Sequence, residues 1–505
     1  MLIGMDLGTS SVRVAVVDQG GRILGLGQRE YSIEVPCPGW AEQDTEVWWR
    51  ATAAACSEAL HCSQVPPASV RAIGLSGQMH GTVLVSDDGR AIGRAIIWAD
   101  GRSAAVADGL NCELGLDRLA CMAGNRVSPG FMAATLRWLG TERPELLEKA
   151  RWALLPKDYL RLRLTGEAAS EPSDASASLL FDITRDQWSA ELTSAAGVET
   201  TLLPGIVASH AVAGRLTAAA AEVLGLQAGT PVVAGAGDQA AQAVGNGVLE
   251  PSTASCTVGT GGQLLQPAAS PSPDPQLRVH CFRHAVPGTW FLMAAILSAG
   301  LSLRWWRDTL GLPADTGYQI LDGEAAEAGL GAGGLLFLPY LLGERTPHMD
   351  SRARGAFVGL ALGHGRGHLA RAIMEGVAMA LAEGLEVLSE LVPRPSMLVA
   401  SGGGARSRLW RQIQADVLGL PLTTVIGQER AVVGAAMLAG MGAGVFHSFE
   451  EARQACVMYG PSTEPQPQAR REYERLAAMY RSLYPALRQV FEGLADWRVG
   501  MGAGT

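Results

Sequence analysis

A segment near the N-terminus carries residue types that bind phosphate and a divalent cation. Asp6 is followed by Gly8, Thr9 and Ser10, and Arg13 comes three residues later. A glycine in a turn lets backbone N–H groups approach phosphate oxygens, while the hydroxyls and the guanidinium add further donors. The carboxylate of Asp6 could hold Mg²⁺, directly or through water. Taken alone, the segment also fits an ordinary hairpin turn.

A second segment of the same kind lies close to half the chain away. Gly259, Thr260 and Gly261 stand between two strand-like runs, as Gly8 and Thr9 do. A flexible glycine turn is the alternative for this segment alone. The two segments together predict a phosphate group held between two related hairpins, and therefore two related halves with a ligand between them.

A third glycine-rich segment follows another strand-like run. Gly403 and Gly404 precede Ser407 and the start of an expected helix. Glycines at this place would let an adenosine lie against the backbone near a helix N-terminus, although a tight turn is the alternative. The segment 329–334 has the G-x-G-x-x-G spacing of dinucleotide sites, but it opens no helix, so we reject that interpretation.

A carboxylate between a buried strand and a helix is the candidate general base. Asp238 follows two glycines and precedes Gln239. Facing a cleft, its carboxylate could accept the proton of a substrate hydroxyl during phosphoryl transfer, and the glycines would admit the substrate. On this motif alone, a helix N-cap is the favoured role for Asp238, because Asp is a common cap.

The segment Gly77-Gln78-Met79-His80-Gly81 lies between two expected strands. Its backbone and the imidazole of His80 could bind sugar hydroxyls. The alternative is a histidine packed within a loop, since histidine is of intermediate burial in proteins.

The pattern of the remaining chain places these segments at the ends of strands. Short strand-like runs alternate with helical ones in both halves, which predicts an α/β class with layered sheets. We expect strands at 2–6, 12–18, 22–28, 71–75, 82–86, 231–234, 290–296 and 397–400. We expect helices from an Asp44 cap to about 62, from about 239, from near 298, from about 408 and over 468–491. The segment 266–276 reads as a surface loop and 500–505 as a frayed tail.

Composition excludes several classes of protein. Of 40 basic residues only Lys149 and Lys157 are lysines, and neither follows a glycine, which excludes a Walker-A phosphate loop. The net charge of −9 disfavours a nucleic-acid binder. Eight scattered cysteines and the lack of a leader-like N-terminus predict a cytoplasmic location with reduced thiols. The uncharged segment 285–303 contains proline, glycines and hydroxyls, so we expect no membrane span there.

The ordered motifs resemble the FGGY family of carbohydrate kinases, within the actin, hexokinase and chaperone ATPase superfamily, and most of all its xylulokinases. The resemblance covers about residues 1–490. It rests on MLIGMDLGTSSVRV at 1–14, GLSGQMHGTVL at 74–84, IIWADGRS at 96–103, LLPKDYLRLRLTGE at 154–167, VVAGAGDQAAQAVG at 232–245, FLPYLLGERTPH at 337–348, GAFVGLALGHGRGHLARAIMEG at 355–376 and SGGGARSRLWRQIQAD at 401–416.

The resemblance implies a fold and an activity. The fold would be two actin-like (ribonuclease H-like) ATPase domains, residues 1–247 and 248–505, around a central cleft. The activity would be phosphorylation of D-xylulose to D-xylulose 5-phosphate by ATP with Mg²⁺, and a homodimer would be usual. Another ketose or polyol kinase (ribulose, gluconate or glycerol) is the same-class alternative, and a non-catalytic nucleotide-dependent switch is the other.

The resemblance also assigns roles to matching residues. Asp238 would be the base, Asp6 would assist the metal and phosphates, and Met79 with His80 would bind the sugar. Departures from the xylulokinase pattern are Ala99 and Gln239, where asparagine is common, and Thr135, where the family has lysine. These departures bear on which sugar is bound, with Gln239 kept as a substrate-binding candidate.

Overall fold

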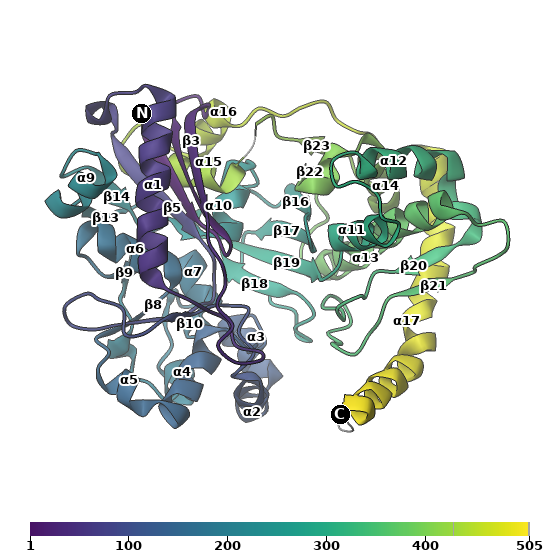
Figure 1. Cartoon of the computed structure of the whole chain (residues 1–505), viewed down its shortest axis with the longest axis horizontal. Helices are drawn as coiled ribbons and strands as arrows, with labels where there is room; N and C mark the ends of the chain where they lie inside the picture. The colour runs from purple at the N-terminus through teal and green to yellow at the C-terminus, as the bar shows by residue number, and fades with distance from the viewer. Residues whose placement is uncertain (428, 503–505) are drawn as a thin grey trace.

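The computed structural model describes residues 1–427 and 429–502 and consists of two lobes, each built on a mixed sheet (Figure 1). The first sheet has the strand order β13-β14-β5-β1-β2-β3, with β15 also paired to β5. Its strands are β1 (Leu2–Leu7), β2 (Ser11–Val17), β3 (Ile23–Glu30), β5 (Ala72–Gly77), β13 (Val212–Arg215), β14 (Pro231–Val233) and β15 (Ala236–Gly237).

The second sheet repeats the pairing of the first. Its order is β18-β19-β17-β16-β22-β23. Its strands are β16 (Thr253–Val258), β17 (Gly262–Ala268), β18 (His280–Arg283), β19 (Trp290–Ile296), β22 (Met397–Ser401) and β23 (Leu422–Thr424). Strand β1 pairs antiparallel with β2 and parallel with β5, just as β16 pairs with β17 and β22. The predicted internal repeat is confirmed at the level of topology.

Most residues of the central strands are buried because helices cover both faces of each sheet. Helix α1 (Thr45–Ser63) starts at Asp44, whose side chain accepts from the Glu46 N–H, as predicted. The other helices of the first half are α2 (Ala104–Leu114), α3 (Leu116–Ala123), α4 (Met132–Glu142), α5 (Pro144–Glu148), α6 (Pro156–Thr165), α7 (Pro172–Ala177), α8 (Ala190–Ala195), α9 (Ala218–Leu224) and α10 (Asp238–Gly245).

The second half contributes seven α-helices within the described residues. They are α11 (Gly300–Thr309), α12 (Gly317–Ala328), α13 (Arg366–Leu391), α14 (Arg408–Leu418), α15 (Arg430–Gly442), α16 (Phe449–Cys456) and α17 (Pro467–Gly502). None of the helices described is long and apolar enough to cross a membrane. The segment 285–303 is strand β19 and the start of α11, as expected.

Short ribbons and 3₁₀ turns complete the described structure. The two-stranded ribbons are formed by β4 (Glu42–Gln43), β6 (Val83–Val85), β7 (Ala95–Ile96), β8 (Trp152–Leu154), β9 (Ala169–Ser170), β10 (Phe181–Asp182), β11 (Gln187–Trp188), β12 (Gly205–Ile206), β20 (Leu336–Leu338) and β21 (Ala356–Val358). The 3₁₀ turns are η1 (Pro67–Ser69), η2 (Thr200–Leu202), η3 (Leu330–Gly334) and η4 (Gly403–Arg406).

Helix α15 belongs to the second half of the chain but packs on the sheet of the first. Glycines make this close approach possible: a Cβ at Gly4 of β1 would lie 2.0 Å from the Val432 carbonyl oxygen, and one at Gly74 of β5 would lie 1.9 Å from that of Ala435. Helix α15 also crosses α10, where a Cβ at Gly434 would lie 1.9 Å from the Ala241 carbonyl oxygen. The two lobes are therefore joined by backbone-to-backbone packing, beyond the covalent link.

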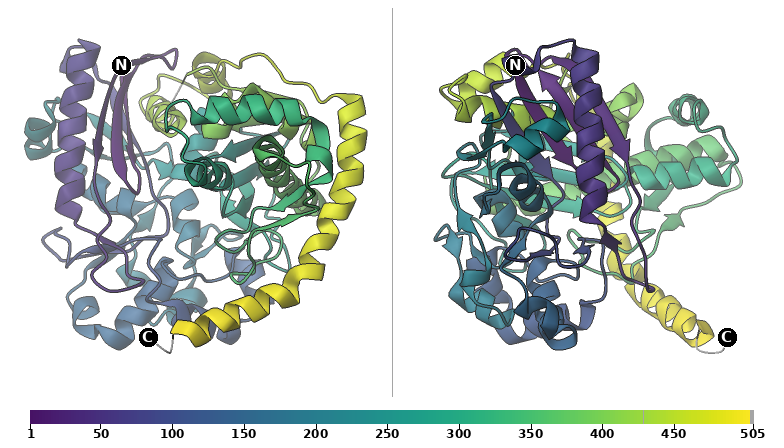
Figure 2. Two further views of the ribbon diagram at one scale, coloured as in Figure 1. Left: turned by 45° about the vertical axis from the view of Figure 1, so that its right-hand side comes forward. Right: turned by 60° about the vertical axis from the view of Figure 1, so that its left-hand side comes forward.

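Two sequence expectations are wrong in their limits. The segment 266–276 is not all surface loop, because β17 continues to Ala268 and Gln266 is fully buried, with its amide donating to the Pro251 and Pro393 carbonyls. The tail predicted at 500–505 is helical as far as Gly502, and residues 503–505 lie outside the described residues. Helix α17 extends away from the body and bends along its length (Figure 2), with Pro485 inside it.

Candidate active site

The first glycine segment forms the turn between β1 and β2. The Gly8 N–H donates to the Ser11 carbonyl (3.0 Å), and a Cβ on Gly8 would lie 3.0 Å from the same oxygen. Thr9 is held from two sides: its hydroxyl accepts from Trp98 Nε1 (2.8 Å) and its carbonyl from Gln43 Nε2 (2.7 Å). The turn is therefore a fixed loop.

The equivalent turn between β16 and β17 is fixed in a similar way. The Gly259 N–H donates to the Gly261 carbonyl (2.9 Å), and the Gly259 carbonyl accepts from the Gly300 N–H (2.8 Å) at the start of α11. A Cβ on Gly261 would lie 2.8 Å from the Ile296 carbonyl oxygen. Thr260 is exposed, so its hydroxyl and the neighbouring turn remain accessible to a ligand.

Arg13 does not project freely toward the turn. Its Nε lies 3.2 Å from a carboxylate oxygen of Glu429 and also donates to Gln28. The pair links β2 of the first half to the start of α15 in the second. Any contact between Arg13 and a phosphate would therefore replace the Glu429 contact.

A buried and a half-buried carboxylate, Asp6 and Asp238, lie where β1 ends and α10 begins. Asp6 accepts from the Ser76 hydroxyl on the neighbouring strand β5 (2.7 Å), while burial raises the pKa of its carboxyl. Burial, together with the negative charge of Asp6, raises the pKa of Asp238 to about 7, and hydrogen bonding from Gln239 opposes this. A carboxyl with a pKa near neutrality can take up and release a proton at physiological pH.

Asp238 is not a helix N-cap, contrary to the role favoured by its motif alone. The cap is Gly237, and Asp238 is the first residue of α10, with no side-chain capping bond. The Gly237 N–H donates to the Ser173 hydroxyl (3.1 Å), which itself donates to Glu171 (2.8 Å). The Asp238 carboxylate therefore makes no capping bond and is free to contact a ligand. The backbone next to it is fixed by the hydrogen bond to Ser173.

A fully buried ion cluster lies behind this backbone. Lys157 Nζ lies 2.6 Å from Asp158, 3.7 Å from Glu171 and 3.5 Å from Asp174, and it also donates to the Ala234 carbonyl (3.4 Å). Burial by itself would lower the pKa of Lys157, but the three carboxylates raise it above its ordinary value. Burial raises the pKa of Asp174 well above its ordinary value, which disfavours its ionised form, and Arg161 lies 2.9 Å from Asp158, so Lys157 shares the neutralisation of this cluster with Arg161.

Met79 and His80 lie next to the same backbone. A Cβ on Gly237 would lie 2.9 Å from Met79 Cγ, so the two residues are in contact. His80 adopts a left-handed φ of 73°, its ring stacks on Phe131 at 3.7 Å between centroids, and its Nδ1 bonds to the Ala177 carbonyl (2.8 Å). His80 is therefore packed within a loop, which was one of the two interpretations of its motif. Its Nε2 is the ring atom left to bind a ligand, which was the other.

The third glycine segment lines a cavity of about 490 Å³ in the second lobe. Gly259 and Thr260 of the second turn and Gly403, Gly404 and Ser407 all face this cavity. Ser407 caps α14, accepting from the Trp410 N–H (3.0 Å), and is hydrogen-bonded to Asp322. The structure thus brings the second turn and the adenosine candidates together in one pocket.

Substitution of Gly403 tests whether this pocket holds the nucleotide. No atom outside its chain neighbours lies within 4 Å of a Cβ at Gly403, so a side chain there would enter the cavity and not the core. We expect Gly403→Val to weaken ATP binding by on the order of tenfold, about 1.4 kcal/mol, with the urea midpoint unchanged. Calorimetric titration with ATP measures the first and equilibrium unfolding the second. Unchanged ATP affinity would show that the nucleotide does not bind in this pocket.

Family models decide which kind of ATP-binding protein this is. The FGGY family of carbohydrate kinases, N-terminal domain, matches residues 1–245, and the C-terminal domain of the same family matches residues 254–443. The chain belongs to the FGGY family of carbohydrate kinases. It is therefore a sugar kinase with the two-domain actin-like ATPase fold of that family, and ATP is a substrate.

Individual FGGY kinases are similar over nearly the whole chain. The chain is 35% identical to a xylulose kinase of Bacillus subtilis, over 98% of this chain and 99% of that one. It is 39% identical to a xylulose kinase of Escherichia coli, over 88% and 90%. A solved xylulose kinase structure from Brucella ovis matches with a TM-score of 0.91 at 36% identity, covering 97% and 99%.

Several residues near the FGGY kinase site were not singled out from the sequence. Trp98 and Ser76 lie in family blocks, so their motifs could have identified them. Tyr318 and Asp322 line the 490 Å³ cavity from α12, and no motif in that helix pointed to them.

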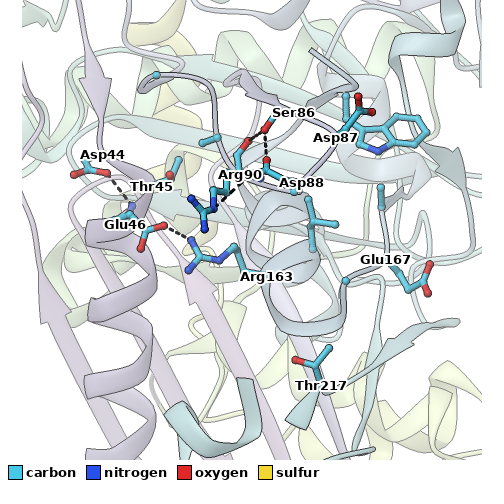
Figure 3. Close-up of a pocket in the computed structure, with 17 residues that line it drawn as sticks. Asp44, Thr45, Glu46, Ser86, Asp87, Asp88, Arg90, Arg163, Glu167 and Thr217 are labelled. Carbon is cyan, nitrogen blue, oxygen red and sulfur yellow. Dashed lines mark hydrogen bonds and ion pairs between the residues drawn. The ribbon is translucent and has the colours of Figure 1, made fainter. Parts of the chain in front are cut away.

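A larger cavity lies away from the candidate site. It measures about 1060 Å³ and lies between the start of α1, the loop after β6 and the end of α6 (Figure 3). Its charged residues include the ion pairs of Arg163 with Glu46 and of Arg90 with Asp88. None of the candidate site residues lines it.

Proposed function

We propose that this kinase transfers the γ-phosphoryl group of ATP to the terminal hydroxyl of D-xylulose, giving D-xylulose 5-phosphate. The observation that carries the proposal is the Asp238 carboxyl, whose pKa is raised to about 7 by burial and by the charge of Asp6, and whose chain neighbour Gly237 contacts Met79. The xylulose kinases that resemble the chain over nearly its whole length support the choice of sugar.

In this mechanism the sugar binds against Met79 and His80 with its terminal hydroxyl toward Asp238. The Asp238 carboxylate accepts the hydroxyl proton as the oxygen attacks phosphorus. The turns at Gly8-Thr9 and Gly259-Thr260 hold the phosphates, and the pocket of Gly403, Gly404 and Ser407 holds the adenosine. Closure of the two lobes keeps water, a competing nucleophile, away from the phosphoryl group.

Asp6 is the residue proposed to hold Mg²⁺. One of its oxygens accepts from Ser76 and the other remains available, and Asp238 lies close enough to add a second negative charge. No group of three or more metal-binding side chains occurs among the described residues. Mg²⁺ is usually held by one or two carboxylates, waters and substrate phosphates, and Asp6 and Asp238 supply two carboxylates. When bound, the ion neutralises the charge that develops on the phosphates.

A substrate panel tests the choice of sugar. Coupled detection of ADP with D-xylulose, ribulose, gluconate and glycerol should give the highest kcat/KM with D-xylulose. Gln239, the neighbour of Asp238, is the substrate-binding candidate that departs from the xylulokinase pattern, so the panel also measures what that departure changes. If another sugar gave a higher kcat/KM, that sugar and not D-xylulose would be the preferred substrate.

We expect the pH profile of kcat/KM to report Asp238. Because its pKa in the free enzyme is about 7, the carboxylate form needed for catalysis is lost as pH falls through 7. The value of kcat/KM for the sugar should rise through about pH 7 and drop about tenfold per pH unit well below it. Initial rates at saturating ATP measure this profile. A profile that is flat between pH 6 and 8 would contradict the assignment.

We also propose two domains, residues 1–247 and 248–505, in an enzyme of the cytoplasm. The repeated sheet topology of the two halves supports the division, and eight free cysteines support a reducing compartment. Fractionation of cells, followed by detection of the enzyme with the cytoplasmic fraction, tests the location.

A homodimer formed through the projecting part of α17 is a further proposal. Val490, Leu494 and Trp497 follow one another at helical spacing and are 53%, 44% and 62% exposed. Neighbouring charges are already paired, since Arg352 lies 3.6 Å from Glu492. A second copy of the same apolar stripe would cover these side chains.

Light scattering after gel filtration tests the dimer. Wild-type protein should show twice the chain mass of 52.9 kDa, and the pair of changes Leu494→Glu and Trp497→Glu should return it to one chain mass. Val223→Glu on α9, which alters an equally exposed apolar residue, is the control and should leave the dimer intact. A wild-type monomer would refute the proposal.

A further inference from the structure

The chain that follows β3 supports the first glycine turn from outside. The Tyr31 hydroxyl donates to the Gly8 carbonyl (2.6 Å), and the Tyr31 N–H donates to the Ser10 carbonyl (3.0 Å). Nε2 of Gln43 donates to the Thr9 carbonyl (2.7 Å). Three successive carbonyls of the turn are therefore held by two side chains and one N–H from this part of the chain.

The amide of Gln43 is fixed in a single orientation. Its oxygen accepts from Trp48 Nε1 (3.2 Å), which can only donate, and from Nε2 of Gln78 (2.9 Å). Its nitrogen must then face the Thr9 carbonyl, to which it donates. Gln43 is 2% exposed and Gln78 is 1% exposed, so water does not compete for these bonds.

Tyr31 is a donor throughout the physiological pH range. Burial, together with the negative charge of Asp6, raises the pKa of its hydroxyl, so the phenol keeps its proton. Nε2 of Gln43 also lies 3.5 Å from the carbonyl oxygen of Ser32, the residue that follows Tyr31. The two residues that support the turn therefore lie next to each other.

Two N–H groups of the turn face away from these supports. In a trans peptide the carbonyl of one residue and the N–H of the next point in opposite directions, and the peptide bonds of this turn are trans. The bonds to the Gly8 and Thr9 carbonyls therefore turn the N–H groups of Thr9 and Ser10 away from Tyr31 and Gln43. Among the residues that the structure describes, none accepts a hydrogen bond from either N–H. Successive N–H groups arranged in this way form a site for an anion.

The supports decide which atoms the turn presents to a ligand. Gly8 has no Cβ, so an unsupported turn could rotate its peptide groups at little cost. The rotated turn would present carbonyl oxygens, which repel an anion. Donors that are fixed before the reaction stabilise a phosphate without a cost for reorganisation. The bonds from Tyr31 and Gln43 therefore favour the orientation that binds phosphate.

We propose that Tyr31 and Gln43 are positioning residues of the kinase, which hold the carbonyls of the first turn so that the N–H groups of Thr9 and Ser10 bind a phosphate group of ATP. This inference rests on the proposed function, in which the turn holds phosphates, and it deepens that function by naming the residues that set the geometry of the turn. Both side chains act through the turn and do not contact the nucleotide.

The test compares nucleotide ligands with and without phosphate groups. Wild type and Tyr31→Phe would be titrated by calorimetry with a nonhydrolysable ATP analogue, adenylyl imidodiphosphate with Mg²⁺, and with adenosine. Tyr31→Phe keeps the ring and removes the hydroxyl, so the Gly8 carbonyl loses its donor. Loss of one neutral hydrogen bond corresponds to roughly 3–10-fold weaker binding of the analogue, and to a change of less than about twofold for adenosine, which has no phosphate.

A second variant and a matched control accompany this comparison. Gln43→Met removes the other side-chain donor to the turn and should give the same pattern, with urea unfolding as the measure of whether its fold is kept. Tyr459→Phe makes the same chemical change as Tyr31→Phe at a hydroxyl that also donates to backbone carbonyls, those of Asn246 and Gly247. It should change neither dissociation constant.

The outcome for Tyr31→Phe decides the assignment, even if Gln43→Met fails to fold. Weaker binding of the analogue with unchanged binding of adenosine supports it. Equal losses for the two ligands, or no loss for either, would overturn it. Absence of D-xylulose turnover in wild type would refute the proposed function instead and would leave this comparison intact, because nucleotide binding is measured without sugar.

Discussion

Asp238→Asn is expected to lower kcat for D-xylulose by on the order of 10²–10⁴-fold. The amide keeps the size of the carboxylate and cannot accept the hydroxyl proton. The fold should survive, because burial and Asp6 already raise the pKa of Asp238, so its ionised form is disfavoured in the folded protein above about pH 4. Removing the charge therefore leaves stability equal or higher at neutral pH. Steady-state kinetics and urea unfolding at pH 7.5 measure the two effects.

The matched control is Asp117→Asn, an exposed aspartate in the first turn of α3. It makes the same chemical change at a helix start away from the cleft, and we expect no change in kcat. If Asp238→Asn retained more than a tenth of wild-type turnover, another group would have to be the base. The rise of kcat/KM through pH 7 should also disappear in this variant.

Lys157→Met is expected to destabilise the folded protein by about 3–5 kcal/mol, the range found when one partner of a buried ion pair is removed. The methionine fills a similar volume but leaves Asp158, Glu171 and Asp174 together without their ammonium group, fully buried. Arg161 still pairs with Asp158, and the raised pKa of Asp174 disfavours its ionised form, so Glu171 is the carboxylate most affected by the loss of the ammonium group. The shift of the urea midpoint at pH 7.5 measures the effect.

The chain offers its own control in its only other lysine. Lys149→Met removes the same charge from an exposed position and should change the free energy of unfolding by less than about 0.5 kcal/mol. A loss below 1 kcal/mol for Lys157→Met would mean that the acids are protonated in the wild-type protein and need no counter-charge. Because Lys157 also donates to the Ala234 carbonyl, residual folded variant should have reduced kcat.

Sequence patterns predicted those parts of the site that are formed by residues close together in the chain. The turns at Gly8 and Gly259 follow from strand–glycine–strand patterns, and both are found between paired strands. The start of α1 at Asp44 follows from capping chemistry. The glycine segment before α14 likewise lines the cavity that its motif indicated.

Features that depend on distant segments could not be predicted in this way. The Glu429 partner of Arg13 comes from the other half of the chain. The N-cap role for Asp238 was wrong because Gly237, tied to Ser173, takes that position. The cluster around Lys157 gathers acids from α6 and α7, and nothing in their spacing indicates that they converge.

The packing of α15 on the first sheet has a consequence for how the protein is made. Gly4 and Gly74 form a surface that only the backbone of α15 fills, and α15 ends at Gly442. During synthesis, β1 and β5 leave the ribosome long before their covering helix exists. After β5 emerges, the ribosome must add more than 300 further residues, which takes on the order of 20–70 s at about 5–20 residues per second. Until then the first sheet exposes an uncovered apolar face, so the N-terminal half is a natural client for chaperones and a poor candidate for expression alone.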